Sequence, residues 1–122
     1  SKFKLEIEKS RSNINKFIKQ STRLNKSIHI YGASTKGNII LQYCKINSVK
    51  IKFAADRNPD KFNRYTPGSN IKIISEAESR SMKPDYYLVM PWHFKNEIIK
   101  REKNFTKNGG KLIFPLPKFQ VL

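Results

Sequence analysis

The stretch that decides the fold is Ile28–Asn38, IHIYGASTKGN, in which a short apolar run leads into a loop bounded by Gly32 and Gly37. An apolar run of this length next to glycine is typical of a buried strand that ends in a tight turn. In a parallel α/β sheet, the loop after the first strand lies at the carboxyl edge, where ligands bind. The amides that open the following helix favour an anion, so Lys36 makes this loop a candidate phosphate contact.

Strand-like and helix-like segments alternate along the rest of the chain. The expected strands are 28–31, 49–55, 71–74, 86–90 and 111–114, and the expected helices are 36–45, 76–81 and 92–107. Such alternation is typical of a parallel sheet with helices on both faces. The prediction is therefore an α/β fold: a Rossmann-like three-layer domain with a parallel sheet of about five strands, preceded by an N-terminal amphipathic helix.

The N-terminal helix is expected over residues 1–25, and the Rossmann-like domain over residues 26–122. Within residues 1–25, apolar residues recur at helical spacings of three, four and seven, namely Phe3, Ile7, Ile14, Phe17, Ile18 and Leu24. The pattern starts directly after Ser1 without a helix start signal. This predicts that the helix leads in from an upstream domain that is missing from the chain.

Two later segments carry further expectations. Residues 57–69 hold Asn58-Pro59 and Thr66-Pro67-Gly68, which are turn signals, so a long loop suited to binding or docking is expected there. In the helix at 92–107, the apolar residues Trp92, Phe94, Ile98, Ile99 and Phe105 recur at helical spacing. Regular structure is expected to end at Pro115-Leu116-Pro117.

The composition excludes several classes of protein. The net charge is +16, but the lysines are spread over almost every segment and no nucleic-acid-binding motif accompanies them. Nucleic acid is therefore not expected as a partner, and small anionic ligands fit better. No apolar run is long enough to span a membrane. The single cysteine, Cys44, cannot form an intrachain disulfide and is expected to be a packed small hydrophobe. The expected compartment is the cytoplasm, and no metal site is expected.

The spacing of the glycine loop matches neither standard phosphate motif. A dinucleotide fingerprint needs glycine where Ser34 stands, and a Walker A loop needs lysine followed by serine or threonine directly after Gly37, where Asn38 stands. Asp56 ends the second strand, where a ribose-binding carboxylate would lie, although it could equally cap the next turn. A second open alternative is that Gly32 and Gly37 only form the turn and allow helix packing.

Other polar residues are expected at the same edge of the sheet. Arg57 follows the second strand, and Trp92 and His93 follow the fourth. Trp92 could stack on a base or pack on a neighbouring domain. His29 lies inside the first strand and is expected to be structural. There is no nucleophile elbow, no metal-ligand cluster and no pair of carboxylates at a recognisable spacing, so no catalytic residue is assigned and the chain alone is not expected to be active.

Six blocks in order resemble the C-terminal domain of S-adenosylmethionine-dependent sugar C-methyltransferases. They are YGASTKGN at 31–38, ADRNPDK at 55–61, RYTPGS at 64–69, PDY at 84–86, PWHFKNEI at 91–98 and GGK at 109–111. The resemblance covers roughly residues 5–117. It implies a parent enzyme with a zinc-binding N-terminal domain, a central domain that binds S-adenosylmethionine, and this C-terminal Rossmann-like domain.

The resemblance also implies the partners and the site. The substrate would be a nucleotide-linked keto-sugar, with a dTDP-linked sugar expected, held between this domain and the central domain. The loop residues Gly32, Ser34, Thr35, Lys36, Gly37 and Asn38 would face that cleft, with Lys36 near the diphosphate. Asp56, Arg57 and the turn at 64–69 would form one wall, and Trp92 and His93 the far side. The family often has asparagine at the position of His93, which argues against His93 as a required catalyst.

Two alternatives remain open. The chain could be a stand-alone nucleotide-binding or regulatory Rossmann-like module without methyltransferase activity. Its positive charge could also serve nonspecific binding of an anionic polymer. Tight DNA binding with only mild salt sensitivity would favour this alternative, because charge alone gives a steep salt dependence.

Overall fold

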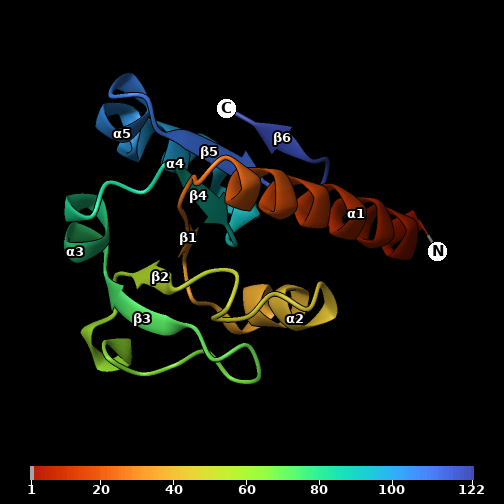
Figure 1. The fold of residues 1–122 in the computed structure, drawn as a ribbon, viewed down its shortest axis with the longest axis horizontal. Coiled ribbons are helices and arrows are strands. Elements are labelled where there is room, and N and C mark those ends of the chain that lie inside the picture. Colours follow the sequence, from red (N-terminus) through yellow and green to blue (C-terminus); the bar gives the residue numbers. More distant parts are fainter. Residues whose placement is uncertain (1) are drawn as a thin grey trace.

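A single six-stranded sheet forms the centre of the molecule, with the strand order β3-β2-β1-β4-β5-β6 (Figure 1). The computed structural model describes residues 2–122, with only the backbone of Phe3, so Ser1 at the start of the predicted helix lies outside the described residues. The strands are β1 (Ile28–Tyr31), β2 (Phe53–Asp56), β3 (Lys72–Ser75), β4 (Tyr86–Val89), β5 (Lys111–Phe114) and β6 (Gln120–Val121). The first five run parallel, as predicted, and β6 is antiparallel to β5.

The two central strands are buried because their sequences are almost continuously apolar. β1 pairs with β4 so that Ile30 lies opposite Leu88 and Tyr31 lies opposite Val89. These four side chains are almost inaccessible to solvent. A strand covered on both faces has no need for alternating polar residues, which explains the unbroken apolar runs.

Helices cover both faces of the sheet, so the predicted three-layer α/β fold is confirmed. On one face lie α1 (Lys2–Arg23) and α2 (Thr35–Tyr43), where Ile14 and Ile18 of α1 line a core with Ile28 and Leu88. On the other face lie α3 (Glu76–Ser81), α4 (Lys95–Arg101) and α5 (Lys103–Lys107). Tyr31 alternates to that second face, where its hydroxyl bonds to Glu102. Figure 1 shows α1 extending along the first face.

Several predicted boundaries are wrong. Regular structure does not end at Pro115-Leu116-Pro117, because the chain turns back and adds β6 beside β5. The second strand begins at Phe53, since residues 48–50 form a turn that leaves Val49 exposed and residues 51–52 only lead into the strand. The expected helix at 92–107 is divided into the 3₁₀ turn η2 (Trp92–Phe94), α4 and α5. The loop at 57–69 contains another 3₁₀ turn, η1 (Pro59–Lys61).

The N-terminal helix is amphipathic as predicted, but it ends at Arg23. Ile14 and Ile18 are buried, and the ring of Phe17 packs edge-on against Tyr86 with 4.8 Å between centroids. Leu24 was assigned to the apolar face but lies beyond the helix end and is 58% exposed. Asn25 follows with a positive φ of 57°, which turns the chain toward β1.

Cys44 lies in the core at the end of α2 and is 1% exposed, so its assignment as a packed hydrophobe is confirmed. Burial raises the pKa of the Cys44 thiol to about 11, which keeps it protonated near neutral pH. Within residues 2–122, no helix combines the length and apolar character that crossing a membrane would need.

His29 is buried, as its place inside β1 predicts, and it makes acid pH destabilising. Its Nδ1 lies 2.7 Å from Ser79 Oγ, and burial lowers the pKa of His29 from 6.5 to about 4. The unfolded chain therefore binds the proton more readily than the folded chain between these two values. The contribution of His29 to stability is complete above pH 6.5 and is lost as the pH falls toward 4.

We expect the free energy of unfolding to fall by about 2–3 kcal/mol over this pH window because of His29. Urea denaturation of the native chain and of His29→Gln at pH 7 and pH 4.5 measures this difference. His93→Gln is the matched control because His93 is exposed. An equal pH dependence in the native chain and in His29→Gln would contradict the assignment.

Candidate functional site

The first loop turns at the point where the strand order reverses. β1 and β4 are neighbours in the sheet, but the helices that follow them lie on opposite faces. Gly32 makes the turn after β1 with a φ of +87°, while its N–H donates to Ala55 O at 2.7 Å. Chain segments that diverge in this way leave a crevice at the carboxyl edge of the sheet, which is the usual ligand position in such folds.

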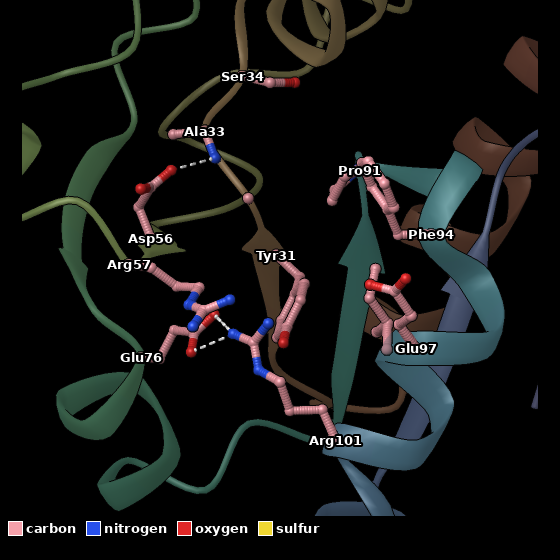
Figure 2. A pocket seen from close by; sticks show the side chains of 12 residues that line it. Tyr31, Ala33, Ser34, Asp56, Arg57, Glu76, Pro91, Phe94, Glu97 and Arg101 are labelled. Carbon is pink, nitrogen blue, oxygen red and sulfur yellow. Dashed lines mark hydrogen bonds and ion pairs between the residues drawn. The ribbon is translucent and has the colours of Figure 1, made fainter.

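A pocket of about 380 Å³ occupies this crevice (Figure 2). Its walls come from the loops after β1, β2 and β4 and from helices α3 and α4. The lining residues are Tyr31, Gly32, Ala33, Ser34, Asp56, Arg57, Glu76, Pro91, Phe94, Glu97, Ile98 and Arg101. Pockets that hold small ligands are commonly of this size and at this place.

The structure divides the predicted site residues into two groups. Four of them line the pocket: Gly32, Ser34, Asp56 and Arg57. The other six do not line it: Thr35, Lys36, Gly37, Asn38, Trp92 and His93. The members of the second group lie in α2 and η2, directly after the lining residues in the chain.

Much of the glycine loop serves the start of α2. Ser34 is the N-cap, and its Oγ accepts a hydrogen bond from the N–H of Gly37 at 3.0 Å. A Cβ on Gly37 would lie 2.5 Å from Cβ of Met90, so this glycine allows the helix to approach the end of β4. The alternative in which Gly37 serves helix packing is therefore supported by its contacts.

Asp56 caps a turn, as the second interpretation of its position predicted. Its Oδ2 accepts from the N–H of Ala33 and its Oδ1 from the N–H of Asn58, each at 2.8 Å. Lys61 Nζ lies 3.8 Å from the same carboxylate and donates to Ala33 O at 3.0 Å. These bonds join the loops after β1 and β2 and hold the backbone of one pocket wall in place.

The turn at 64–69 packs on α2 instead of lining the pocket. Asn38 Nδ2 donates to Pro67 O at 2.9 Å, and Asn38 Oδ1 accepts from Ser69 Oγ at 3.0 Å. Gln42, one turn further along α2, also donates to Pro67 O. Asn38 thus connects the long loop to α2, which is a structural contact.

Lys36, Trp92 and His93 form a cluster that joins α2 to η2. Lys36 Nζ lies 3.3 Å from His93 Nε2 and 5.6 Å from the ring centroid of Trp92. The rings of Trp92 and His93 stack with 4.7 Å between centroids. Trp92 is buried, whereas Lys36 and His93 are exposed. The two exposed side chains are available to a ligand, and the indole packs within this domain.

Sequence reasoning missed the acidic and basic side chains of the second pocket wall. Arg101 Nη2 donates to both carboxylate oxygens of Glu76, at 2.6 and 2.5 Å, and its guanidinium lies 5.8 Å from the ring centroid of Tyr31. Figure 2 shows this pair at the pocket beside Tyr31. It joins the start of α3 to the end of α4 across the crevice.

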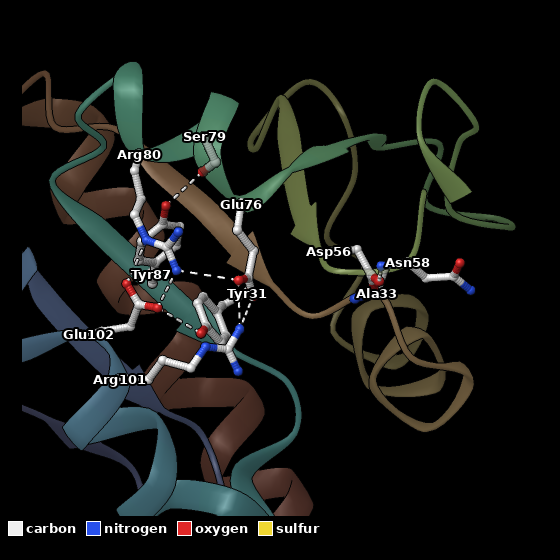
Figure 3. A network of polar contacts seen from close by, with 10 residues as sticks. All are labelled: Tyr31, Ala33, Asp56, Asn58, Glu76, Ser79, Arg80, Tyr87, Arg101 and Glu102. Atoms are coloured by element: carbon white, nitrogen blue, oxygen red, sulfur yellow. Dashed lines mark hydrogen bonds and ion pairs between the residues drawn. The ribbon is translucent and has the colours of Figure 1, made fainter. Parts of the chain in front are cut away.

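Behind this wall, a buried carboxylate organises a network of polar contacts (Figure 3). Glu102 is 1% exposed and accepts from Tyr31 Oη at 2.8 Å. Arg80 donates to both Glu102 oxygens, at 2.9 Å from Nε and 2.6 Å from Nη2, and to Glu76 at 3.3 Å. The network therefore holds the ring of Tyr31, which lines the pocket, in a fixed position.

The electrostatics of the network follow from burial and hydrogen bonding. Burial acts to raise the pKa of Glu102, but the hydrogen bonds from Arg80 and Tyr31 outweigh it, so this pKa lies below its ordinary value. Burial and the bond to Glu102 raise the pKa of Tyr31. Glu102 is thus an anion and Tyr31 a neutral donor at physiological pH.

Two charged side chains that line the pocket lack an ionic or hydrogen-bond partner within residues 2–122: Arg57 and Glu97. Arg57 follows β2, and Glu97 lies in the first turn of α4. The part of the chain that the structure describes contains no group of three His, Cys, Asp or Glu residues that could hold a metal ion. The pocket therefore offers a ligand one cation and one anion that have no partner among the described residues.

Comparison with known proteins agrees with the resemblance drawn from the six blocks. Residues 1–117 match the C-methyltransferase C-terminal domain family. A curated relative, C-methyltransferase NovU of Streptomyces niveus, is 35% identical over 120 residues. The aligned segment is 98% of this chain but only 29% of that relative, so the chain corresponds to a part of the longer protein. The chain belongs to the C-methyltransferase C-terminal domain family.

Proposed function

We propose that this chain is the substrate-binding and domain-docking portion of an S-adenosylmethionine-dependent C-methyltransferase that acts on a nucleotide-linked keto-sugar. Family membership and the similarity to NovU support methyl transfer as the activity of the parent protein. The observation that carries the binding role is the crevice pocket with an unpaired Arg57. An unpaired guanidinium at the carboxyl edge of a parallel sheet is suited to a phosphate.

The ligand would extend from the pocket toward the exposed residues of the neighbouring cluster. Arg57 would bind the diphosphate from one side, and Lys36, with His93 beside it, would lie at the rim where the glycine loop enters α2. Ser34 and Asp56 maintain the loop backbone through their bonds to amide groups. Two cations on separate segments, the loop after β2 and the first turn of α2, would fix both the position and the direction of a diphosphate.

The residues in the crevice do not fit S-adenosylmethionine itself. The carboxylate that could bind a ribose, Asp56, already accepts from two backbone amides, and Met90 fills the space beside Gly37. We therefore propose that the central domain of the parent protein holds this cofactor, which supplies the methyl group. A zinc-binding domain upstream is a further part of the proposal. This chain would bind and orient the sugar, dock on the central domain, and take no direct part in proton abstraction.

Titration of the chain with dTDP-glucose, followed by NMR chemical shifts, tests the binding role. We expect shifts at the pocket, and Arg57→Gln should weaken binding about tenfold because a charge-assisted hydrogen bond is lost. Lys36→Ala should also abolish or strongly weaken binding. Arg23→Gln, which removes an exposed charge at the end of α1, is the matched control, and S-adenosylmethionine should cause no shifts.

Absence of any dTDP-glucose binding by the native chain would overturn the proposed binding role. Micromolar binding of S-adenosylmethionine would overturn the assignment of that cofactor to another domain. The parent reading frame separates this proposal from the stand-alone nucleotide-binding module. An upstream segment with clustered cysteines supports the methyltransferase, and a frame that starts near Ser1 supports the module.

A further inference from the structure

One face of α4 and the turn before it forms the wall of the pocket opposite Arg57. Phe94, Glu97, Ile98 and Arg101 all line the pocket. Glu97 and Ile98 lie four and three positions before Arg101 in α4, which places them on one side of that helix, and Phe94 is the last residue of the 3₁₀ turn that precedes it. Figure 2 shows Phe94, Glu97 and Arg101 along this wall, with Arg57 extending from the opposite side. The pocket therefore has two chemically different walls.

The α4 wall combines an exposed aromatic ring with an unpaired carboxylate. Phe94 is 57% exposed although it lines a pocket, so much of its ring surface remains uncovered. Glu97 is exposed, and no partner for its carboxylate occurs among the residues that the structure describes. A pyranose ring presents C–H groups on its faces and hydroxyl groups around its edge. The negative face of an aromatic ring attracts such C–H groups, and a carboxylate accepts from such hydroxyls.

Charge prevents the α4 wall from holding the diphosphate. Glu97 repels an anion there, and the charge of Arg101 is already neutralised by its bidentate contact with Glu76. Arg57 on the β2 side carries the unpaired positive charge of the pocket. A ligand with an anionic end and a polyhydroxylated end can satisfy both walls in only one direction.

We propose that the pocket orients its ligand by this polarity, with the sugar ring against Phe94 and Glu97 and the diphosphate against Arg57. The inference rests on the proposed function and deepens it, because it assigns sugar recognition to two residues of α4 and its preceding turn. Phe94 supplies the stacking face and Glu97 accepts hydrogen bonds from sugar hydroxyls. Both are binding residues that set specificity, and neither reacts with the substrate.

The test compares dTDP, which lacks the sugar, with dTDP-glucose, by NMR titration of the native chain and of each variant. Glu97→Ala should weaken dTDP-glucose binding about tenfold, because the sugar hydroxyl loses its hydrogen bond to a charged carboxylate. Binding of dTDP, which has no sugar hydroxyl at this position, should be unchanged or slightly tighter. Phe94→Ala should likewise affect dTDP-glucose alone. Arg57→Gln should weaken both ligands to the same extent.

Two further variants separate contact from structure. Glu97→Gln keeps the side-chain shape, and Phe94→Leu keeps an apolar side chain without a ring; each should still reduce dTDP-glucose binding selectively. Glu8→Ala on α1 is the matched control for the loss of one exposed negative charge. Equal weakening of both ligands by the α4 variants, or no effect on either ligand, would overturn the orientation while leaving the proposed function intact. If the α4 variants had no effect on either ligand, the exposed ring of Phe94 would be assigned to a domain interface instead. Failure of the native chain to bind either ligand would overturn both proposals.

Discussion

Glu102→Ala is expected to destabilise the domain by about 3–4 kcal/mol, because it removes a buried carboxylate that accepts three hydrogen bonds and leaves the Tyr31 hydroxyl without its acceptor. Glu102 accepts three hydrogen bonds, two from Arg80 and one from Tyr31, and is almost completely buried. Without it, the Tyr31 hydroxyl loses its acceptor at the centre of the fold. Urea denaturation followed by circular dichroism measures the change in the free energy of unfolding.

Smaller changes to the same network supply the controls. Tyr31→Phe removes one hydrogen bond but keeps Glu102 paired with Arg80, so a loss of about 1 kcal/mol is expected. Glu8→Ala removes an exposed carboxylate and should change stability by less than about 0.5 kcal/mol. If Glu102→Ala were no more damaging than Tyr31→Phe, Arg80 would find sufficient compensation in Glu76 and solvent, and the central role of Glu102 would be wrong.

The central part of the fold could be predicted because burial on both faces produces a distinctive sequence. The runs around Ile30 and Leu88 contain almost no polar residues, and glycine, proline or asparagine marks many of the strand ends. β6 could not be predicted in the same way. It has two residues, follows a proline-rich turn, and exists because β5 offers an unpaired edge.

The wall of the pocket formed by the loops after β1 and β2 could be predicted from topology alone, and the α4 wall could not. The loop after β1 lies at the crevice in any sheet of this type, so Gly32 and Ser34 were found from one motif. Phe94 and Ile99 were assigned to a helical apolar pattern, yet both are exposed. Phe94 belongs to the 3₁₀ turn that precedes α4 and so does not follow the phase of that helix, and Ile99 is the neighbour of the buried Ile98 and points away from the core.

The buried carboxylate of Glu102 was missed for a related reason. Glu102 is flanked by Arg101 and Lys103, so the local sequence resembles a solvated helix face. Its burial depends on the break between α4 and α5 and on the arrival of Arg80 from α3, 22 positions earlier in the chain. Periodicity within one segment cannot show such a contact between segments.

Gly32→Ala is expected to destabilise the domain by about 3–4 kcal/mol, because it combines backbone strain with a steric clash. Gly32 has a φ of +87°, a conformation that residues with a side chain rarely adopt. A Cβ at this position would lie 2.7 Å from Cδ of Pro91 and 3.1 Å from its Cγ. A proline ring cannot rotate out of the way as a flexible side chain would. The loops after β1 and β4 would therefore have to separate, which would also widen the pocket between them.

Gly109→Ala separates the two contributions, because Gly109 has a φ of +98° but no atom within 4 Å of a Cβ built on it. Strain without a clash should cost about 1–2 kcal/mol there. Urea denaturation of both variants gives the difference, which reports the contact with Pro91. Equal losses in the two variants would mean that the β4 loop moves aside freely. If the loops after β1 and β4 are closely packed, Gly32→Ala should lose more stability than Gly109→Ala. Gly32→Ala should also weaken dTDP-glucose binding, and Gly109→Ala should leave that binding unchanged.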